Sequence, residues 1–209
     1  MTRWDNIYKN YQKDGEARAT LSEEIHPLFK DFLQQSDFEV KQVLDIGSGT
    51  GKYLKFLQVD GFKTDGIDSS ETAVTMTREL LADDSIIVCE DMFKFVIPDK
   101  TYDLIISVST LHHGTKEQVQ TLIANINEAL LEGGKVFITL PDFETAEKWN
   151  DFKDHERLAE GTFSPLSGPE KGLPHSFFTK EEVHELFSKF RDLEIQLDEI
   201  GRWIVWGSK

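Results

Sequence analysis

The run Val43–Lys52, VLDIGSGTGK, constrains the fold of this chain more than any other stretch. An apolar segment leads into three glycines at alternate positions, and Tyr53–Leu57 then has the apolar spacing of a helix. Apolar residues without polar alternation are typical of a strand buried on both faces. Glycine lets the backbone turn sharply and approach a ligand closely. The run therefore predicts a strand, a glycine loop and a helix whose first N–H groups face a nucleotide-like ligand.

The rest of the chain alternates apolar strands with helical segments and ends in two short strands around Gly201. This alternation indicates βαβ units, which build a parallel sheet with helices on both faces. We expect a Rossmann-like, doubly wound α/β fold whose seven-stranded sheet is mostly parallel and closes with a C-terminal antiparallel hairpin. The expected strands cover residues 41–46, 61–68, 85–89, 102–108, 135–140, 193–197 and 202–206.

We expect one domain over residues 1–209, with two segments added to the alternating pattern. Residues 1–35 are expected to form an N-terminal helical cap. Residues 141–178 interrupt the pattern with several prolines and glycines, and we predict a helix from about 143 to 160 within them. A connection of this length is more often functional than idle, so a substrate-binding insertion or lid is the expected role. The pattern resumes with a capping box at Thr179.

The composition favours a globular protein in the cytoplasm. The chain is 39% hydrophobic and contains no apolar run of about 18 residues, so no membrane segment is expected. The first residues lack the basic start and apolar core of a secretory signal. The formal net charge of −15 argues against a nucleic-acid partner, whose phosphates need cationic side chains. Cys89 is the single cysteine, which excludes a disulfide framework or a cysteine zinc cluster, and no metal is expected.

The spacing of the glycines separates two kinds of nucleotide loop. A dinucleotide fingerprint needs a third glycine where Lys52 stands, and that glycine falls one residue earlier, at Gly51. A triphosphate loop needs Gly-Lys-Ser or Gly-Lys-Thr, which is absent. The run from Asp45 to Gly51 instead resembles the first motif of class I S-adenosylmethionine-dependent methyltransferases. Acidic residues after the second and third expected strands, Asp68 and Asp91, support this resemblance.

The resemblance implies S-adenosylmethionine as the cofactor and assigns roles to its neighbours. Asp68 would accept hydrogen bonds from the ribose hydroxyls, and Asp91 with Met92 would hold the adenine. Carbonyl groups near Gly47 and Ser107 would take the ammonium group of the methionine part. The cofactor-binding residues expected in this way are Tyr11, Arg18, Asp45, Gly47, Ser48, Gly49, Gly51, Asp68, Ser69, Asp91, Met92 and Ser107.

Several of these positions allow a structural reading as well. The aromatic residues near the N-terminus either pack a helix against the core or form a lid, in which case Tyr11 or Arg18 meets the cofactor carboxylate. Asp45 either anchors the glycine loop or contacts the cofactor. His112 and His113 follow the fourth expected strand and are the candidate catalytic residues, as a general base or as the wall of the substrate pocket. Cys89 is expected to be a buried, inert thiol.

These patterns predict a methyltransferase that acts on a small molecule by in-line displacement. The alternatives are a protein methyltransferase, a nicotinamide oxidoreductase, and a non-catalytic module that binds S-adenosylmethionine. The position of Gly51 speaks against the oxidoreductase. Ser107–Thr110 stands where a DNA amine methyltransferase has an Asn/Asp-Pro-Pro-aromatic sequence. The acceptor atom and the oligomeric state do not follow from the sequence.

Overall fold

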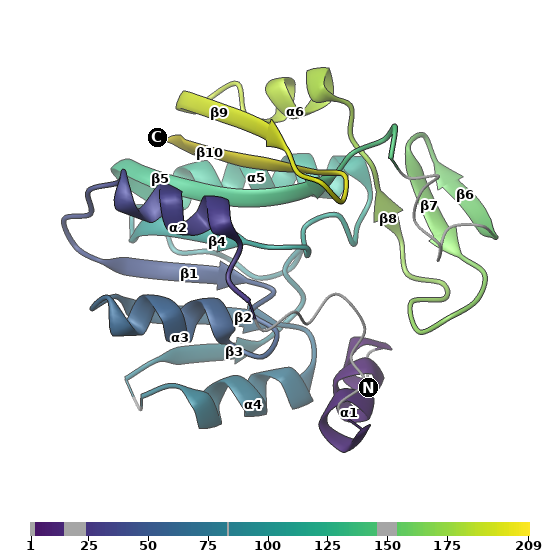
Figure 1. Cartoon of the computed structure of the whole chain (residues 1–209), viewed down its shortest axis with the longest axis horizontal. Helices are drawn as coiled ribbons and strands as arrows, with labels where there is room; N and C mark the ends of the chain where they lie inside the picture. Colours follow the sequence, from purple (N-terminus) through teal and green to yellow (C-terminus); the bar gives the residue numbers. More distant parts are fainter. Residues whose placement is uncertain (1–2, 15–23, 83, 146–153) are drawn as a thin grey trace.

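The computed structural model in Figure 1 describes residues 3–14, 24–82, 84–145 and 154–209. Its helices are α1 (Arg3–Asp14), α2 (Pro27–Gln34), α3 (Lys52–Val59), α4 (Glu71–Leu80), α5 (Lys116–Ala129) and α6 (Lys180–Leu186). The strands of the main sheet are β1 (Gln42–Ile46), β2 (Lys63–Asp68), β3 (Ile86–Cys89), β4 (Tyr102–Ser107), β5 (Leu130–Pro141), β9 (Arg191–Leu197) and β10 (Arg202–Ser208). A second, smaller sheet consists of β6 (His155–Ala159), β7 (Thr162–Pro165) and β8 (His175–Ser176).

The main sheet has the predicted doubly wound topology. Its seven strands follow the order β3-β2-β1-β4-β5-β10-β9. The strands from β3 to β5 are parallel, and β10 pairs antiparallel with both β5 and β9. The chain winds outward from β1 to β3 and then returns to place β4 beside β1. Such a switch point opens a crevice at the carboxyl ends of the two strands, where open α/β sheets bind their ligands.

Helices cover both faces of the main sheet, so both faces of its central strands are buried. Apolar side chains of α5 and α6 pack on one face, and those of α2, α3 and α4 pack on the other. Phe137 of β5 illustrates the second layer, because its ring meets Phe29 of α2 edge-on with the ring centroids 4.9 Å apart. This double burial explains why the strands read as apolar runs rather than as alternating patterns.

Side chains at the helix starts explain where several helices begin. Thr179 and Glu182 form the predicted capping box of α6. The hydroxyl of Ser70 accepts a hydrogen bond from the amide of Ala73 and caps α4. Pro27 stands at the first position of α2, where its missing N–H group costs nothing, so this proline starts the helix instead of kinking it.

The predicted helix from about 143 to 160 is wrong in its last part, and its residues 146–153 lie outside the described residues. Residues 155–159 form β6, which pairs antiparallel with β7 through a turn at Gly161. Every residue of β6 is exposed, so no apolar alternation marks it as a strand. Pairing with β7 determines its conformation, and a periodicity count does not detect such pairing.

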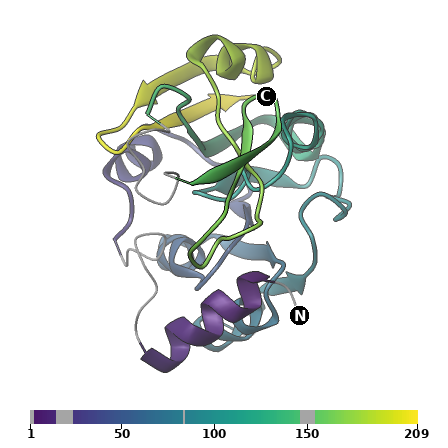
Figure 2. The same ribbon diagram turned by 90° about the vertical axis from the view of Figure 1, so that its right-hand side faces the viewer.

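Helix α1 and the small sheet both lie beyond the carboxyl ends of the parallel strands. In Figure 1 they stand to the right of the strand tips, and Figure 2, turned to face that edge, shows both in front of the main sheet. The two segments added to the alternating pattern therefore meet at the edge where the crevice opens.

Candidate active site

The glycine loop follows β1 and turns the chain from the sheet into α3. The amides of Gly47 and Ser48 donate to the carbonyl of Ile67, at 2.8 and 3.0 Å, which ties the loop to the end of β2. Gly47 has a φ of +79°, and a Cβ at this position would lie 2.1 Å from Cγ2 of Thr110. Glycine alone meets both conditions without strain or clash. The loop backbone consequently runs close to the segment that follows β4.

Asp68 ends β2 and holds the loop in place. One carboxylate oxygen accepts a hydrogen bond from the amide of Gly49 at 3.0 Å, and the other accepts from the amide of Ser70 at 2.8 Å. Burial raises the pKa of Asp68, and these backbone donors oppose the rise. The carboxylate expected to bind the ribose therefore also anchors the glycine loop.

Asp45 lies on β1 beneath the same loop and is 3% exposed. Burial first, and then the neighbouring Asp68, raise the pKa of Asp45 to about 8, while Lys52 opposes the rise. The hydrogen bond from Gly49 goes to Asp68, and within the described residues the Asp45 side chain makes no hydrogen bond to the loop. A cation placed beside Asp45 would favour its ionised form.

A cavity of about 760 Å³ opens above these residues. Trp4 and Tyr8 of α1 form the wall that faces the glycine loop. The residues predicted from the sequence that line the cavity are Asp45, Gly47, Ser48, Gly49, Asp68, Ser69, Asp91, Met92 and His113. The predicted residues outside the lining are Tyr11, Gly51, Ser107 and His112. Arg18 lies outside the described residues.

Two of the predicted residues outside the lining, Ser107 and Gly51, belong to the segments that frame the cavity. The hydroxyl of Ser107 donates to the carbonyl of Ile46 at 2.8 Å and joins the ends of β4 and β1. Gly51 starts α3 with a φ of +80°. On α1 it is Tyr8, one turn before Tyr11, that reaches the loop: a Cβ at Gly49 would lie 2.7 Å from the Tyr8 hydroxyl.

Asp5 attaches α1 to the start of α4. Its carboxylate accepts hydrogen bonds from the hydroxyl of Ser70 at 3.2 Å and from the amide and hydroxyl of Thr72 at 3.0 and 2.8 Å. The hydrogen bond from Lys9 and those from Thr72 hold the pKa of Asp5 well below its usual range. A carboxylate at a helix N-terminus is favoured by the helix dipole. The contact joins residues far apart in the chain, so no local pattern in the sequence indicates it.

The segment after β3 forms the end of the cavity predicted to hold the adenine. Asp91 accepts a hydrogen bond from the amide of Phe93 at 3.0 Å and lies 3.5 Å from the ammonium group of Lys94. Met92 and Cys89 also line the cavity. The expectation that Cys89 is a buried core thiol is wrong, because β3 is an edge strand and its last side chain is exposed.

Histidines gather at the opposite end, where the segment after β4 meets β8. The ring centroids of His112 and His113 are 4.0 Å apart, and those of His113 and His175 are 4.6 Å apart. Trp4 meets His113 edge-on at 4.5 Å. Burial lowers the pKa of His112 and His113 well below the usual value, so both rings are neutral. His113 lines the cavity and His112 lies behind it.

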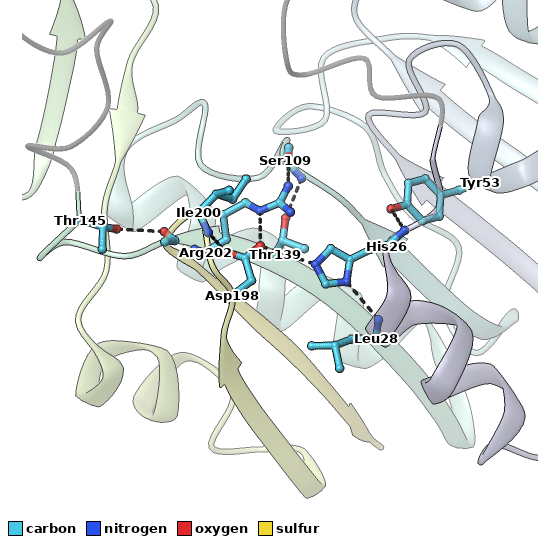
Figure 3. Close-up of polar contacts among 10 residues, drawn as sticks. His26, Leu28, Tyr53, Ser109, Thr139, Thr145, Asp198, Ile200 and Arg202 are labelled. Atoms are coloured by element: carbon cyan, nitrogen blue, oxygen red, sulfur yellow. Dashed lines mark hydrogen bonds and ion pairs between the residues drawn. The ribbon is translucent and has the colours of Figure 1, made fainter.

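A polar network that the sequence did not predict forms a further wall (Figure 3). Arg202 donates through Nε to Asp198 at 2.8 Å and through Nη1 to the hydroxyl of Ser109 at 3.0 Å. Nε2 of His26 lies 3.5 Å from the same carboxylate. Although burial opposes the effect, hydrogen bonds from His26 and Arg202 lower the pKa of Asp198 to about 2. His26, Ser109 and Arg202 all line the cavity.

Ser109 carries backbone strain within this network. Its φ is +57°, a conformation that residues other than glycine rarely adopt. The amide of Ser109 donates to the hydroxyl of Thr139 at 2.7 Å, which helps to hold the strained turn. Such strain concentrates at functional sites. Ser109 is the second residue after β4, and this position in the sequence could have identified it as a candidate site residue. No local pattern in the sequence indicates the contacts of Arg202.

The cavity is lined by side chains of both charges. Asp45, Asp68, Glu90 and Asp91 supply carboxyl groups, and the cationic lining residues are Arg3, Lys52, Lys94 and Arg202. The carboxyl groups can accept hydrogen bonds from the hydroxyls of a ligand and can lie beside a positive charge. Among the residues that the structure describes, none of the helices combines the length and the apolar character that a membrane span requires.

Comparisons with known proteins agree with this geometry. Residues 43–134 match the family model described as a methyltransferase domain. An uncharacterised methyltransferase of Geobacillus sp. (strain WCH70) is 37% identical over 128 residues, which cover 61% of this chain and 60% of that protein. One from Bacillus cytotoxicus is 34% identical over 154 residues, covering 70% of this chain and 71% of that protein.

A more distant relative has a named class of substrate. The protein named "Probable tRNA methyltransferase 9B" of Bos taurus is 27% identical over 186 residues, which cover 81% of this chain and 40% of that protein. Matches to two of the first relatives therefore span 60% and 40% of their lengths.

Solved structures share the fold across the whole chain. The crystal structure of a Pyrococcus horikoshii OT3 protein has a TM-score of 0.77 at 19% identity and covers 100% of both chains. An S-adenosylmethionine-dependent methyltransferase of Mesorhizobium loti has a TM-score of 0.65 at 16% identity, covering 85% of this chain and 95% of that chain. At such identities the likeness shows the fold alone.

Proposed function

Because the chain belongs to the class I S-adenosylmethionine-dependent methyltransferases, we propose that it transfers a methyl group from this cofactor to a small-molecule acceptor. The observation that carries the proposal is the division of the cavity into two ends. The glycine loop and Asp68 form the end suited to the cofactor. Trp4, His113 and Arg202 form a second, partly aromatic end that lies against α1. A cavity of this size, lined by aromatic and polar side chains, suits a small ligand.

The residues at the first end fit S-adenosylmethionine. The cofactor carries an ammonium group and a sulfonium, and the carboxyl groups of Asp45 and Asp68 lie on the wall beside the loop. Gly47 and Gly49 let the loop backbone lie directly against Thr110 and Tyr8, because a Cβ at either glycine would clash with these side chains. When bound, the cofactor supplies an electrophilic methyl group whose transfer leaves a neutral thioether. Asp68 would bind the ribose, and Asp91 with Met92 would hold the adenine.

The residues at the second end would position the acceptor. We assign the contact with the acceptor to His113, because its ring lines the cavity beside Trp4. Arg202 and Ser109 would orient polar groups of the acceptor. Helix α1 and Pro174, on the insertion, would exclude water. Holding the two reactants in line can supply much of the rate acceleration.

A tRNA acceptor is the second candidate, and it rests on the likeness to the bovine relative. The net charge of −15 weighs against it, because binding to a nucleic acid depends on neutralising phosphates. A protein acceptor and a non-catalytic binding module have no specific observation in their favour.

The proposal is tested by measuring the demethylated cofactor released when the purified full chain meets a library of metabolites, with mass spectrometry of each hit. Total tRNA is assayed in parallel. We expect turnover with at least one metabolite and none with tRNA, and a more than tenfold higher KM for the cofactor in Asp68→Ala. Methylation of tRNA alone would replace the small-molecule proposal with the tRNA candidate. Calorimetry that detects no binding of S-adenosylmethionine or its product would refute both.

A further inference from the structure

The histidine cluster brings together ring nitrogens from two distant segments. His112 and His113 follow β4, and His175 lies on β8 of the small sheet. Each ring offers a nitrogen, and these atoms all lie within 4.8 Å of one another. Backbone contacts fix the arrangement, because the amide of Ser176 donates to the carbonyl of His112 at 2.8 Å and its hydroxyl donates to the carbonyl of Gly114 at 2.7 Å.

Several of these nitrogens lack a hydrogen-bond partner. Nδ1 of His112 and both ring nitrogens of His113 are buried and have no partner at ordinary hydrogen-bond geometry within the part of the chain that the structure describes. The backbone of Pro174 and of Ser109 lies near the His113 ring and opposes the lowering of its pKa. Buried polar atoms in native proteins are nearly always paired, so a group of unpaired ones in one place needs an explanation. Water and metal ions are the usual partners at such places.

His175 has the hydrogen-bond pattern of a metal-binding histidine. Its Nδ1 lies 3.0 Å from the carbonyl of Leu173, which can only accept, so Nδ1 carries a hydrogen. Its Nε2 lies 2.7 Å from a carboxylate oxygen of Glu170. An ionised carboxylate also only accepts hydrogen bonds. The contact between Nε2 of His175 and Glu170 therefore requires either a proton shared by the two atoms or a metal ion that both atoms bind. In metal sites a backbone carbonyl commonly fixes one imidazole N–H while the other nitrogen binds the metal.

We propose that His112, His113 and His175, with Glu170 as a fourth ligand, form a site for a divalent transition-metal ion that prefers nitrogen ligands, Zn²⁺ in particular. Three imidazoles and one carboxylate match the ligand types and the coordination number of zinc. Bonds of about 2.0–2.1 Å in a tetrahedron place ligand atoms about 3.3 Å apart. Side-chain rotation must therefore bring the three rings together and open the 2.7 Å contact between His175 and Glu170. Because His113 lines the cavity, the ion would lie at its acceptor end.

The same residues are consistent with a site without metal, in which the rings pack in tilted and edge-on contacts beside an ion pair of His175 and Glu170. Titration of the chelator-treated full chain with Co²⁺ and Zn²⁺ separates the two readings. For the wild type we expect a visible absorption spectrum of tetrahedral cobalt and calorimetric binding of about one equivalent of zinc. The cobalt spectrum and the zinc titration need neither acceptor nor cofactor. The metal site can therefore be refuted while the proposed methyl transfer is confirmed, and methyl transfer can be refuted while the metal site is confirmed.

Variants locate the site. His113→Gln and Glu170→Gln are expected to weaken zinc binding at least tenfold, on the scale of losses seen when a partner of a metal ligand is removed. His184→Gln, at an exposed histidine of α6, is the matched control and is expected to bind like the wild type. Absence of the cobalt spectrum in the wild type would overturn the proposal even if a variant failed to fold. Folded His113→Gln that binds zinc as tightly as the wild type would overturn it as well.

Discussion

Asp45→Asn should stabilise the cofactor-free protein, and the gain should grow as the pH rises. The ordinary pKa of the carboxyl is 3.8, and in the folded protein it is about 8. Between these values the folded state keeps a proton that the unfolded state has lost, so stability falls as the pH increases. The loss is about 1.4 kcal/mol per pH unit, or about 2.7 kcal/mol between about pH 5 and about pH 7. Asparagine has nearly the same shape and does not ionise, so the variant avoids this loss.

Urea unfolding at both pH values, followed by tryptophan fluorescence, measures the effect. The variant retains some pH dependence, because burial also raises the pKa of Asp65 and Asp68. Asp31→Asn, at an exposed position of α2, controls for the removal of one negative charge and should shift stability little at either pH. A difference between wild type and Asp45→Asn that is the same at both pH values would show that Asp45 is not held protonated and would refute the reasoning.

Three further predictions concern the cofactor end and the core. Asp68→Ala should weaken binding of S-adenosylmethionine more than tenfold in calorimetry, since hydrogen bonds to a charged group contribute roughly 1.5–3 kcal/mol; unchanged affinity would remove Asp68 from the ribose site. Asp5→Ala should cost about 1 kcal/mol by removing the hydrogen bonds between its carboxylate and Thr72 in the first turn of α4. It should also speed hydrogen exchange in α1, and equal exchange would contradict this docking role. Phe137→Ala should cost about 3–5 kcal/mol in urea unfolding, because its side chain is fully buried between helices and strands.

The sequence predicted those parts of the fold whose burial or backbone conformation is visible in the local order of apolar residues and glycines. Strands such as β4 are apolar throughout because both faces are covered, and the glycines of the loop mark a required backbone conformation. Positions directly after parallel strands share one edge of the sheet, so the order of the strands alone places Asp68 and Asp91 at the cavity.

The small sheet and the long-range polar contacts around the cavity have no such local pattern in the sequence. Strand β6 is exposed along its whole length and takes its conformation from pairing with β7, so its pattern resembled a helix. The contacts of Arg202 with Ser109, and of Asp5 with Thr72, join residues far apart in the chain. Contacts of this kind depend on the tertiary fold and not on local propensity. A single sequence therefore identifies the glycine-loop side of the cavity better than the side formed by Arg202 and the small sheet.

Helix α1 connects the two ends of the cavity, and this limits how independently they can act. Tyr8 reaches the glycine loop, while Trp4, one turn earlier, packs against His113. Asp5 between them holds the helix on α4, whose start also provides the Ser70 amide to Asp68. A change that loosens α1 should therefore weaken cofactor and acceptor binding together, whereas changes at His113 or Asp68 should each affect one of them. Coupling through one docked helix is the physical reason for expecting this difference.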